Sequence, residues 1–117
     1  MQRAIAAYAA GIRARSVSDM QRAFPAMSAS VQRNWSALFS AVRDIDAQTS
    51  DIELTPTGAG DGGGATLSLA VSFPNPANRR PCTQVTQLRL RLARAGATWH
   101  IVSLEQTGST SSPGCNG

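Results

Sequence analysis

The hydrophobic residues of the first 45 positions recur at helical spacing. Over residues 2–15 the apolar positions share one stripe and the arginines lie off it, which predicts an amphipathic helix. That stripe consists of Ile5, Tyr8, Ala9 and Ile12. A short helix is predicted next, because Ser18 and Gln21 form a capping box and Pro25 disfavours helical geometry at Phe24.

A third and longest helix is predicted after Ser28, which offers an N-cap. Apolar residues then recur at intervals of three and four as far as Ile45. They are Val31, Trp35, Leu38, Phe39, Val42 and Ile45. Trp35 and Phe39 lie one turn apart and are expected to face a sheet.

From Asp51 onward the hydrophobic period changes to two, so the helical and strand halves are expected to meet near Thr49 and Ser50. Alternation predicts strands over 52–56, 66–73, 87–92 and 99–106, joined by turns rich in Gly, Pro and Asn. The predicted fold class is α+β, with N-terminal helices packed on an antiparallel four-stranded meander. Residues 1–106 are expected to form this single domain, and the small polar residues 107–117 a flexible tail.

The glycine-rich segment 58–64 is predicted to be a mobile hairpin tip and not a phosphate loop. A phosphate loop needs a lysine and a following helix. This chain has no lysine, and a strand follows the segment.

The composition predicts a folded domain and argues against several partners. A hydrophobic fraction of 42% with 15% charged residues is too apolar for a chain disordered throughout. All 11 basic residues are arginines, but they are scattered, the net charge is only +4 and aromatic residues are 5%, so nucleic-acid binding is not expected. No apolar stretch is long enough to span a membrane.

Cys82 and Cys115 have no CxxC spacing and no neighbouring histidine, so a zinc site is not expected, and neither is another metal or a cofactor. Two alternatives stay open for the pair. They form a disulfide, which would imply an oxidising compartment, or they are two unpaired thiols.

The order of these elements resembles that of a nuclear transport factor 2-like domain, also described as SnoaL-like. The resemblance rests on Tyr8 in the first helix, on Ser18-Asp19-Met20 before Phe24-Pro25, and on the closing Trp99-x-Ile101 strand, and it covers nearly all of residues 1–106. It implies a curved sheet that wraps the helices into a cone, whose open end holds a ligand, and a homodimer through the outer face of the sheet.

Enzymes of the resembling family rely on aspartate or histidine in the cone, and this chain departs from that pattern. Its one histidine, His100, alternates with Trp99 and Ile101 and is expected to face away from the core. The acidic residues lie at predicted element ends, where solvated positions are usual, and Asp46 or Glu53 at the cone rim is left as a candidate. No catalytic residue is assigned.

Two further pairs are candidates for ligand contact. Arg89 and Arg91 share one face of a strand and could bind a carboxylate, a phosphate or an acidic partner, although charges paired across strands are the commoner arrangement. Tyr8 and Trp35 could line a pocket, although such aromatics more often belong to the core.

The leading hypothesis is a non-catalytic ligand-sensing or protein-interaction domain. The segment around Met27-Ser28 and Trp35 resembles accessory domains of bacterial signalling proteins such as serine/threonine kinases, which lie in or outside the cytoplasm. A rival is a small SnoaL-like enzyme doing acid/base chemistry on an apolar substrate with His100, Asp46 or Tyr8. A third is a structural module whose cone is filled by its own side chains.

Overall fold

The computed structural model describes residues 1–56 and 62–115 of the 117-residue chain. Three helices precede four strands and a closing 3₁₀ turn. They are α1 (Gln2–Arg13), α2 (Val17–Ala23), α3 (Ala29–Ala41), β1 (Asp46–Pro56), β2 (Gly62–Pro74), β3 (Pro81–Ala95), β4 (Thr98–Ser111) and η1 (Pro113–Cys115). The strands form one antiparallel sheet in the order β1-β2-β3-β4, so the predicted α+β class and the predicted meander are confirmed.

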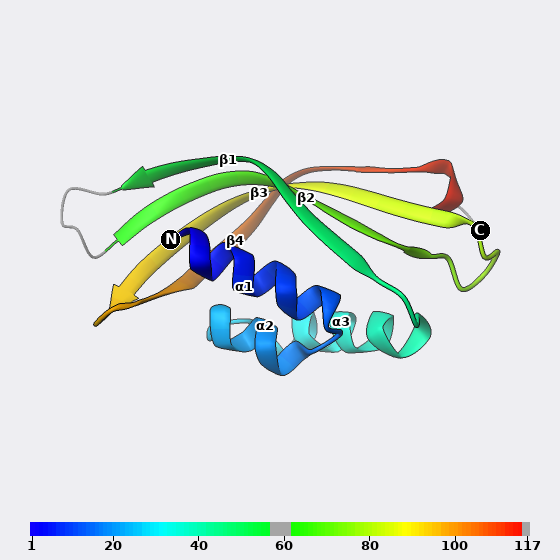
Figure 1. The fold of residues 1–117 in the computed structure, drawn as a ribbon, viewed down its shortest axis with the longest axis horizontal. Coiled ribbons are helices and arrows are strands. Elements are labelled where there is room, and N and C mark those ends of the chain that lie inside the picture. Colours follow the sequence, from blue (N-terminus) through cyan, green and yellow to red (C-terminus); the bar gives the residue numbers. More distant parts are fainter. Residues whose placement is uncertain (57–61, 116–117) are drawn as a thin grey trace.

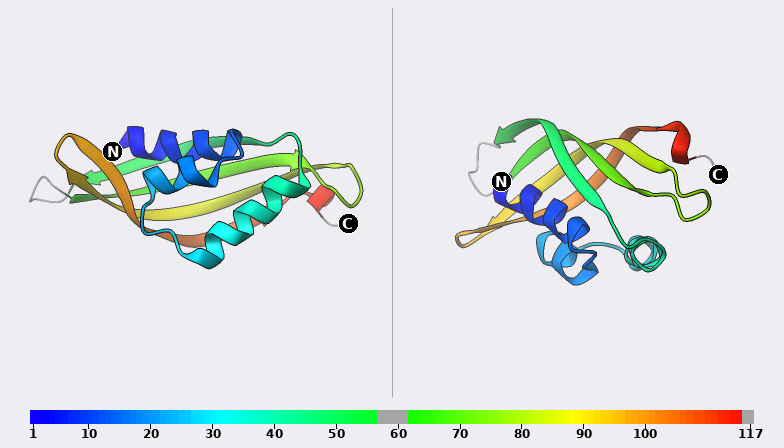
Figure 2. Two further views of the ribbon diagram at one scale, coloured as in Figure 1. Left: turned by 90° about the horizontal axis from the view of Figure 1, so that it is seen from below. Right: turned by 45° about the vertical axis from the view of Figure 1, so that its right-hand side comes forward.

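The sheet is strongly curved, and all three helices lie on its concave side (Figures 1 and 2). The helices do not cover it equally. α1 packs against β1 and β4, and α2 packs against β4, whereas α3 adjoins α2 and stands off from the sheet (Figure 2).

The core lies between α1, α2 and the concave face of the sheet. Alternation along each strand points every second side chain inward. Ile12, Met20 and Ile101 are completely buried. The other large core residues include Ile5, Tyr8, Phe24, Leu67, Leu69, Val71, Leu88, Leu90 and Leu92.

Gly11 brings α1 and α2 into close contact. A Cβ built on Gly11 would lie 2.7 Å from Cγ of Met20 and 2.8 Å from its backbone nitrogen. Only glycine fits this crossing without a shift of one helix. The contact fixes the pair of helices that carries the core.

The N-cap of α2 is Ser16 and not Ser18. The hydroxyl oxygen of Ser16 accepts a hydrogen bond from the backbone N–H of Asp19 at 3.1 Å, and Ser16 itself is extended. The helix therefore begins two residues earlier than the capping box predicted, and it ends at Ala23 just before Phe24-Pro25, as expected.

The change from helix to strand comes earlier than expected. α3 ends at Ala41, where Val42 turns extended, and β1 already begins at Asp46. A β-bulge explains the error: the register with β2 shifts between Ser50 and Glu53, and Asp51 has φ 53°. The bulge moves the inward-facing positions of β1 from odd to even numbers, so a regular alternation is visible only from Ile52.

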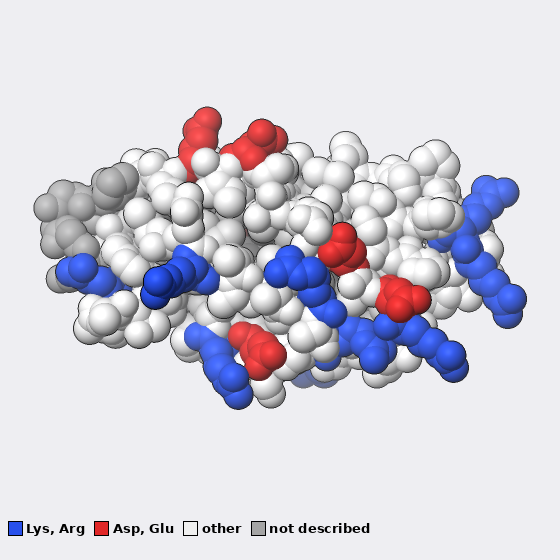
Figure 3. Space-filling view, in the orientation of Figure 1, with Lys and Arg blue, Asp and Glu red and all other residues white. Residues whose placement is uncertain are grey.

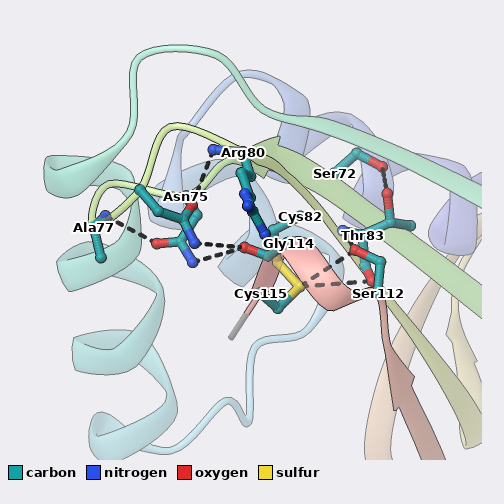
Figure 4. Close-up of a disulfide and its surroundings, with 10 residues drawn as sticks. Ser72, Asn75, Ala77, Arg80, Cys82, Thr83, Ser112, Gly114 and Cys115 are labelled. Carbon is teal, nitrogen blue, oxygen red and sulfur yellow. Dashed lines mark hydrogen bonds between the residues drawn. A yellow bond between two sulfur atoms is a disulfide. The ribbon is translucent and has the colours of Figure 1, made fainter. Parts of the chain in front are cut away.

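The expectation of a flexible tail is wrong for residues 107–115. β4 continues to Ser111 opposite β3, and Cys115 forms a disulfide with Cys82, their Cα atoms 4.6 Å apart (Figure 4). Ser112 donates its N–H to the carbonyl of Thr83 at 2.9 Å. Pairing with β3 and the crosslink supply the order that the small polar side chains could not, and residues 116–117 lie outside the described part.

The predicted glycine-rich tip is described only at its end. Gly62, Gly63 and Gly64 are paired within β2, so the strand starts earlier than the alternation indicated. Residues 57–61 lie outside the described residues.

Candidate functional site

A cavity of about 460 Å³ lies between α3 and the concave face of the sheet. We call it the cone pocket. Its apolar lining comes from one stripe of α3 and from inward-facing sheet positions: Val31, Trp35, Leu38, Leu69, Val71, Leu88 and Leu104. Its polar lining is Tyr8, Asn34, Gln84, Thr86, Gln106 and Ser109.

The position of α3 explains why this cavity is open. Val31 is 37% exposed although it belongs to the apolar stripe, and Trp35 and Leu38 are only half-buried. Trp35 packs on Phe39 of the same helix, with ring centroids 5.6 Å apart. The stripe therefore faces the sheet across a gap, and its aromatic residues do not fill it.

Tyr8 links α1 to the cone pocket. Its side chain is buried, its ring meets Phe24 edge-on with centroids 6.5 Å apart, and burial raises its pKa to about 12. A hydrogen bond with Trp35 opposes that shift. Because an indole N–H only donates, the Tyr8 oxygen accepts from Trp35 and its own proton is available for a third group.

The cone pocket has no acid/base pair among its described lining residues. The polar groups there are amides and hydroxyls, and no carboxylate, imidazole or guanidinium lines it. Tyr8 is the titratable side chain of this lining, and with a pKa of about 12 it remains protonated under ordinary conditions. The pocket can donate and accept hydrogen bonds, but it offers no charge.

No protein-family model and no curated protein matches the chain. Solved structures do. A protein from Novosphingobium aromaticivorans, provisionally named a scytalone dehydratase, superposes with a TM-score of 0.75 at 11% identity over 93% of this chain and 83% of its own. A provisional dehydratase of the nuclear transport factor 2-like family from Streptomyces avermitilis gives 0.71 at 12% identity, over 90% and 91%.

The chain has the nuclear transport factor 2-like cone fold. A hexachlorocyclohexane dehydrochlorinase from Novosphingobium barchaimii superposes with a TM-score of 0.71 at 8% identity, over 97% of this chain and 88% of its own. At such identities the likeness concerns the fold alone.

The structure places the candidate residues of the cone fold in three different regions. Tyr8 and Trp35 come together at the cone pocket. Asp46 is exposed at the start of β1, where its carboxylate accepts hydrogen bonds from the Gln48 amide at 3.1 and 3.3 Å, and it does not line that pocket. His100 alternates with the buried Ile101 and therefore lies on the other face of β4.

Arg89 and Arg91 are exposed on the convex face of the sheet, opposite the cone pocket. Arg89 Nη1 lies 3.5 Å from Glu105 Oε2 on the neighbouring strand. This is the cross-strand pairing that the sequence offered as the alternative to a ligand site. At 63% and 65% side-chain exposure the pair contributes little to stability.

Sequence reasoning missed the polar lining of the cone pocket. Gln84 and Thr86 alternate in phase with Leu88, so a third strand traced back to Pro81 would have pointed them inward. Asn34 adjoins Trp35 on α3 and lies one turn from both Val31 and Leu38.

Two negative observations concern the described residues. Within 1–56 and 62–115, no group of three or more His, Cys, Asp or Glu side chains is placed to hold a metal ion. None of the helices in these ranges has the length and apolarity needed to cross a membrane.

Proposed function

We propose that the protein binds a small, largely apolar and uncharged molecule in the cone pocket. The observation that carries this proposal is the lining: apolar side chains with a few neutral hydrogen-bonding groups around about 460 Å³. That volume suits a small-molecule site. A charged ligand would lose its hydration there without meeting an opposite charge, which is costly.

Tyr8 is the group that would orient such a ligand. Its oxygen is engaged by Trp35, so its O–H is left to donate to a carbonyl or hydroxyl oxygen of the guest. Asn34 and Gln84 would supply further hydrogen bonds from α3 and β3. The buried donor would favour guests that carry an acceptor over plain hydrocarbons.

Fluorescence of Trp35 tests the proposal. In a Trp99→Phe background Trp35 is the single tryptophan, and uncharged cyclic ketones such as cyclohexanone and decalone should change its emission at saturable concentrations. Thr86→Phe, which places a larger side chain in the pocket, should abolish the response. Thr66→Phe is the matched control, because Thr66 is exposed and pairs with Arg89 outside the pocket. Equal binding by the Thr86 variant would overturn the proposal.

A second candidate is a small enzyme working on the same kind of molecule, and the neighbouring dehydratases and dehydrochlorinase favour it. Of the three side chains put forward for catalysis, Tyr8 alone lines the cone pocket. With a pKa of about 12 it would act as a hydrogen-bond donor to an oxygen that gains negative charge, and not as a base.

Tyr8→Phe separates the two candidates. Dehydration of a β-hydroxyketone, followed by the absorbance of the enone product, would be catalysed by an enzyme and slowed by about tenfold or more in this variant. A non-catalytic binding domain would give no enone above the background rate, and Tyr8→Phe would change only the affinity for ketones.

The homodimer through the sheet face and the attachment to a larger bacterial protein are further parts of the proposal. The exposed Arg91 on the convex face would lie in such a dimer. The disulfide favours an oxidising compartment for the domain. Light scattering after size-exclusion chromatography should give twice the chain mass, and Arg91→Glu should shift it toward the monomer.

A further inference from the structure

A second cavity, of about 510 Å³, lies at the end of the molecule where α1, the α3–β1 connection and the β2–β3 loop meet. We call it the arginine pocket. It shares no lining residue with the cone pocket. Each of the three segments supplies one arginine to it: Arg13, Arg43 and Arg79. Figure 3 shows basic side chains along the lower half of this face and at its right-hand end, with acidic side chains among them.

The three guanidinium groups are not neutralised by direct contact with a carboxylate. Within the described ranges the ion pairs are Arg22–Asp19 and Arg89–Glu105, and neither involves the arginine pocket. Asp44 and Asp46 also line it, but the Asp46 carboxylate accepts a hydrogen bond from the Gln48 amide and forms no ion pair with these arginines. The pocket therefore has a surplus of one positive charge, from three arginines and two aspartates.

One arginine is held in place. Arg13 donates from Nη1 to the backbone carbonyl of Ala47 at 2.7 Å, which ties the end of α1 to the start of β1. The rest of its planar guanidinium remains for a second partner, because arginine has five N–H donors. Arg43 and Arg79 are exposed at the rim.

The floor of the arginine pocket is apolar and its outer wall is braced. Ile45 and Phe73 are half-buried there, and Pro74 and Pro81 flank them. The loop between these prolines is tied down at both ends: Asn75 Nδ2 donates to the Gly114 carbonyl at 2.9 Å, and Cys82 is bonded to Cys115 (Figure 4). A wall fixed in this way loses little entropy when a ligand binds.

We propose that the arginine pocket binds a small organic carboxylate whose body is apolar. The guanidinium plane pairs with a carboxylate through two parallel hydrogen bonds, and the apolar body covers Ile45 and Phe73. The surplus of one charge matches a monoanion. Phosphorylated ligands of higher charge fit less well, because Asp44 and Asp46 would repel them.

Benzoate is the probe for this site. Titration calorimetry should detect its binding to the full chain, and amide resonances should shift at Ile45 and Phe73. Benzamide, which keeps the shape and loses the charge, should not bind, and acetate should bind more weakly than benzoate. The double variant Arg43→Gln/Arg79→Gln should weaken benzoate binding by about tenfold or more, since hydrogen bonds to charged groups are lost.

Arg33→Gln is the matched control, because Arg33 is exposed on α3 and lines neither cavity. It should bind benzoate as the parent does. Equal affinity for benzamide, an unaltered affinity in the double variant, or shifts at Leu69 and Leu88 of the cone pocket would each overturn the proposal. Thr86→Phe should leave benzoate binding intact, which separates this site from the proposed function.

Discussion

The indole N–H of Trp35 donates a hydrogen bond to the hydroxyl oxygen of Tyr8, and this contact joins α3 to α1 at the edge of the cone pocket. α3 otherwise stands off from the sheet. The link therefore helps to hold the helix that forms one wall of the pocket, and it engages the Tyr8 oxygen.

Stability should fall in alkaline solution because of Tyr8. The unfolded chain loses the tyrosine proton near pH 10, whereas burial keeps it bound in the folded chain up to about pH 12. Between these values the folded state binds more protons, so the free energy of unfolding decreases as pH rises, by up to about 2–3 kcal/mol. Urea unfolding across this range measures it.

This chain suits the measurement because it has no lysine, one tyrosine and no free cysteine among its described residues. Tyr8 therefore dominates proton release in the window. Tyr8→Phe should remove the pH dependence there. If the free energy of unfolding of the variant still falls between pH 10 and pH 12, Tyr8 is not the source of the pH dependence.

The helical half was predictable from sequence because amphipathic stripes are local signals. α1 follows such a stripe, and the buried residues from Ile5 to Ile12 lie where the spacing put them. The predictions failed where contacts between segments far apart in the sequence determine the structure. The bulge at Asp51 inverts the faces of β1, and the strand pairing of 107–111 with β3 has no signature in its own residues.

Gly11→Ala should destabilise the protein although it replaces glycine within a helix. The usual effect of this exchange is a gain of about 1 kcal/mol. Here the added Cβ would press on the backbone of Met20 at 2.8 Å, and overpacking of this kind costs about 1–3 kcal/mol. Thermal unfolding should show a lower midpoint. Ala10→Gly, at an exposed position of the same helix, should cost only the propensity difference, and a higher midpoint for Gly11→Ala would contradict the close contact.

The candidate site was only half visible in the sequence. Tyr8 and Trp35 were named as pocket candidates, but so were Asp46, His100 and the two strand arginines, which lie elsewhere. The sequence does not show which face of the sheet is concave, so it does not show which polar side chains point into the pocket. The arginine pocket was missed for the same reason, since Arg13, Arg43 and Arg79 are far apart in the chain and only the fold brings them together.

Removing the disulfide should destabilise the end of the sheet that carries the arginine pocket. Cys82 and Cys115 are 33 residues apart, and a crosslink over such a loop contributes about 3–4 kcal/mol through the unfolded chain. The variant Cys82→Ser/Cys115→Ser should unfold at lower denaturant concentration and bind benzoate more weakly. Reducing agent should reproduce both effects in the parent and change nothing in the double variant. If reduction leaves benzoate affinity unchanged, the crosslink does not brace the pocket wall.

Arg15 should matter for the cone pocket although it lies outside it. The residue follows α1 with φ 53°, and its Nη1 donates to the carbonyls of Val42 at 2.8 Å and Phe39 at 3.4 Å, at the end of α3. Because α3 stands off from the sheet, this cap is one of few contacts that fix its distance from the strands. Arg15→Gln should cost about 1–2 kcal/mol of stability through the lost hydrogen bonds. It should also weaken ketone binding measured by Trp35 fluorescence. Arg33→Gln, at an exposed position of α3, should change neither stability nor ketone binding. Loss of stability with unchanged ketone affinity would show that the Tyr8–Trp35 link alone is enough to hold the pocket wall in place.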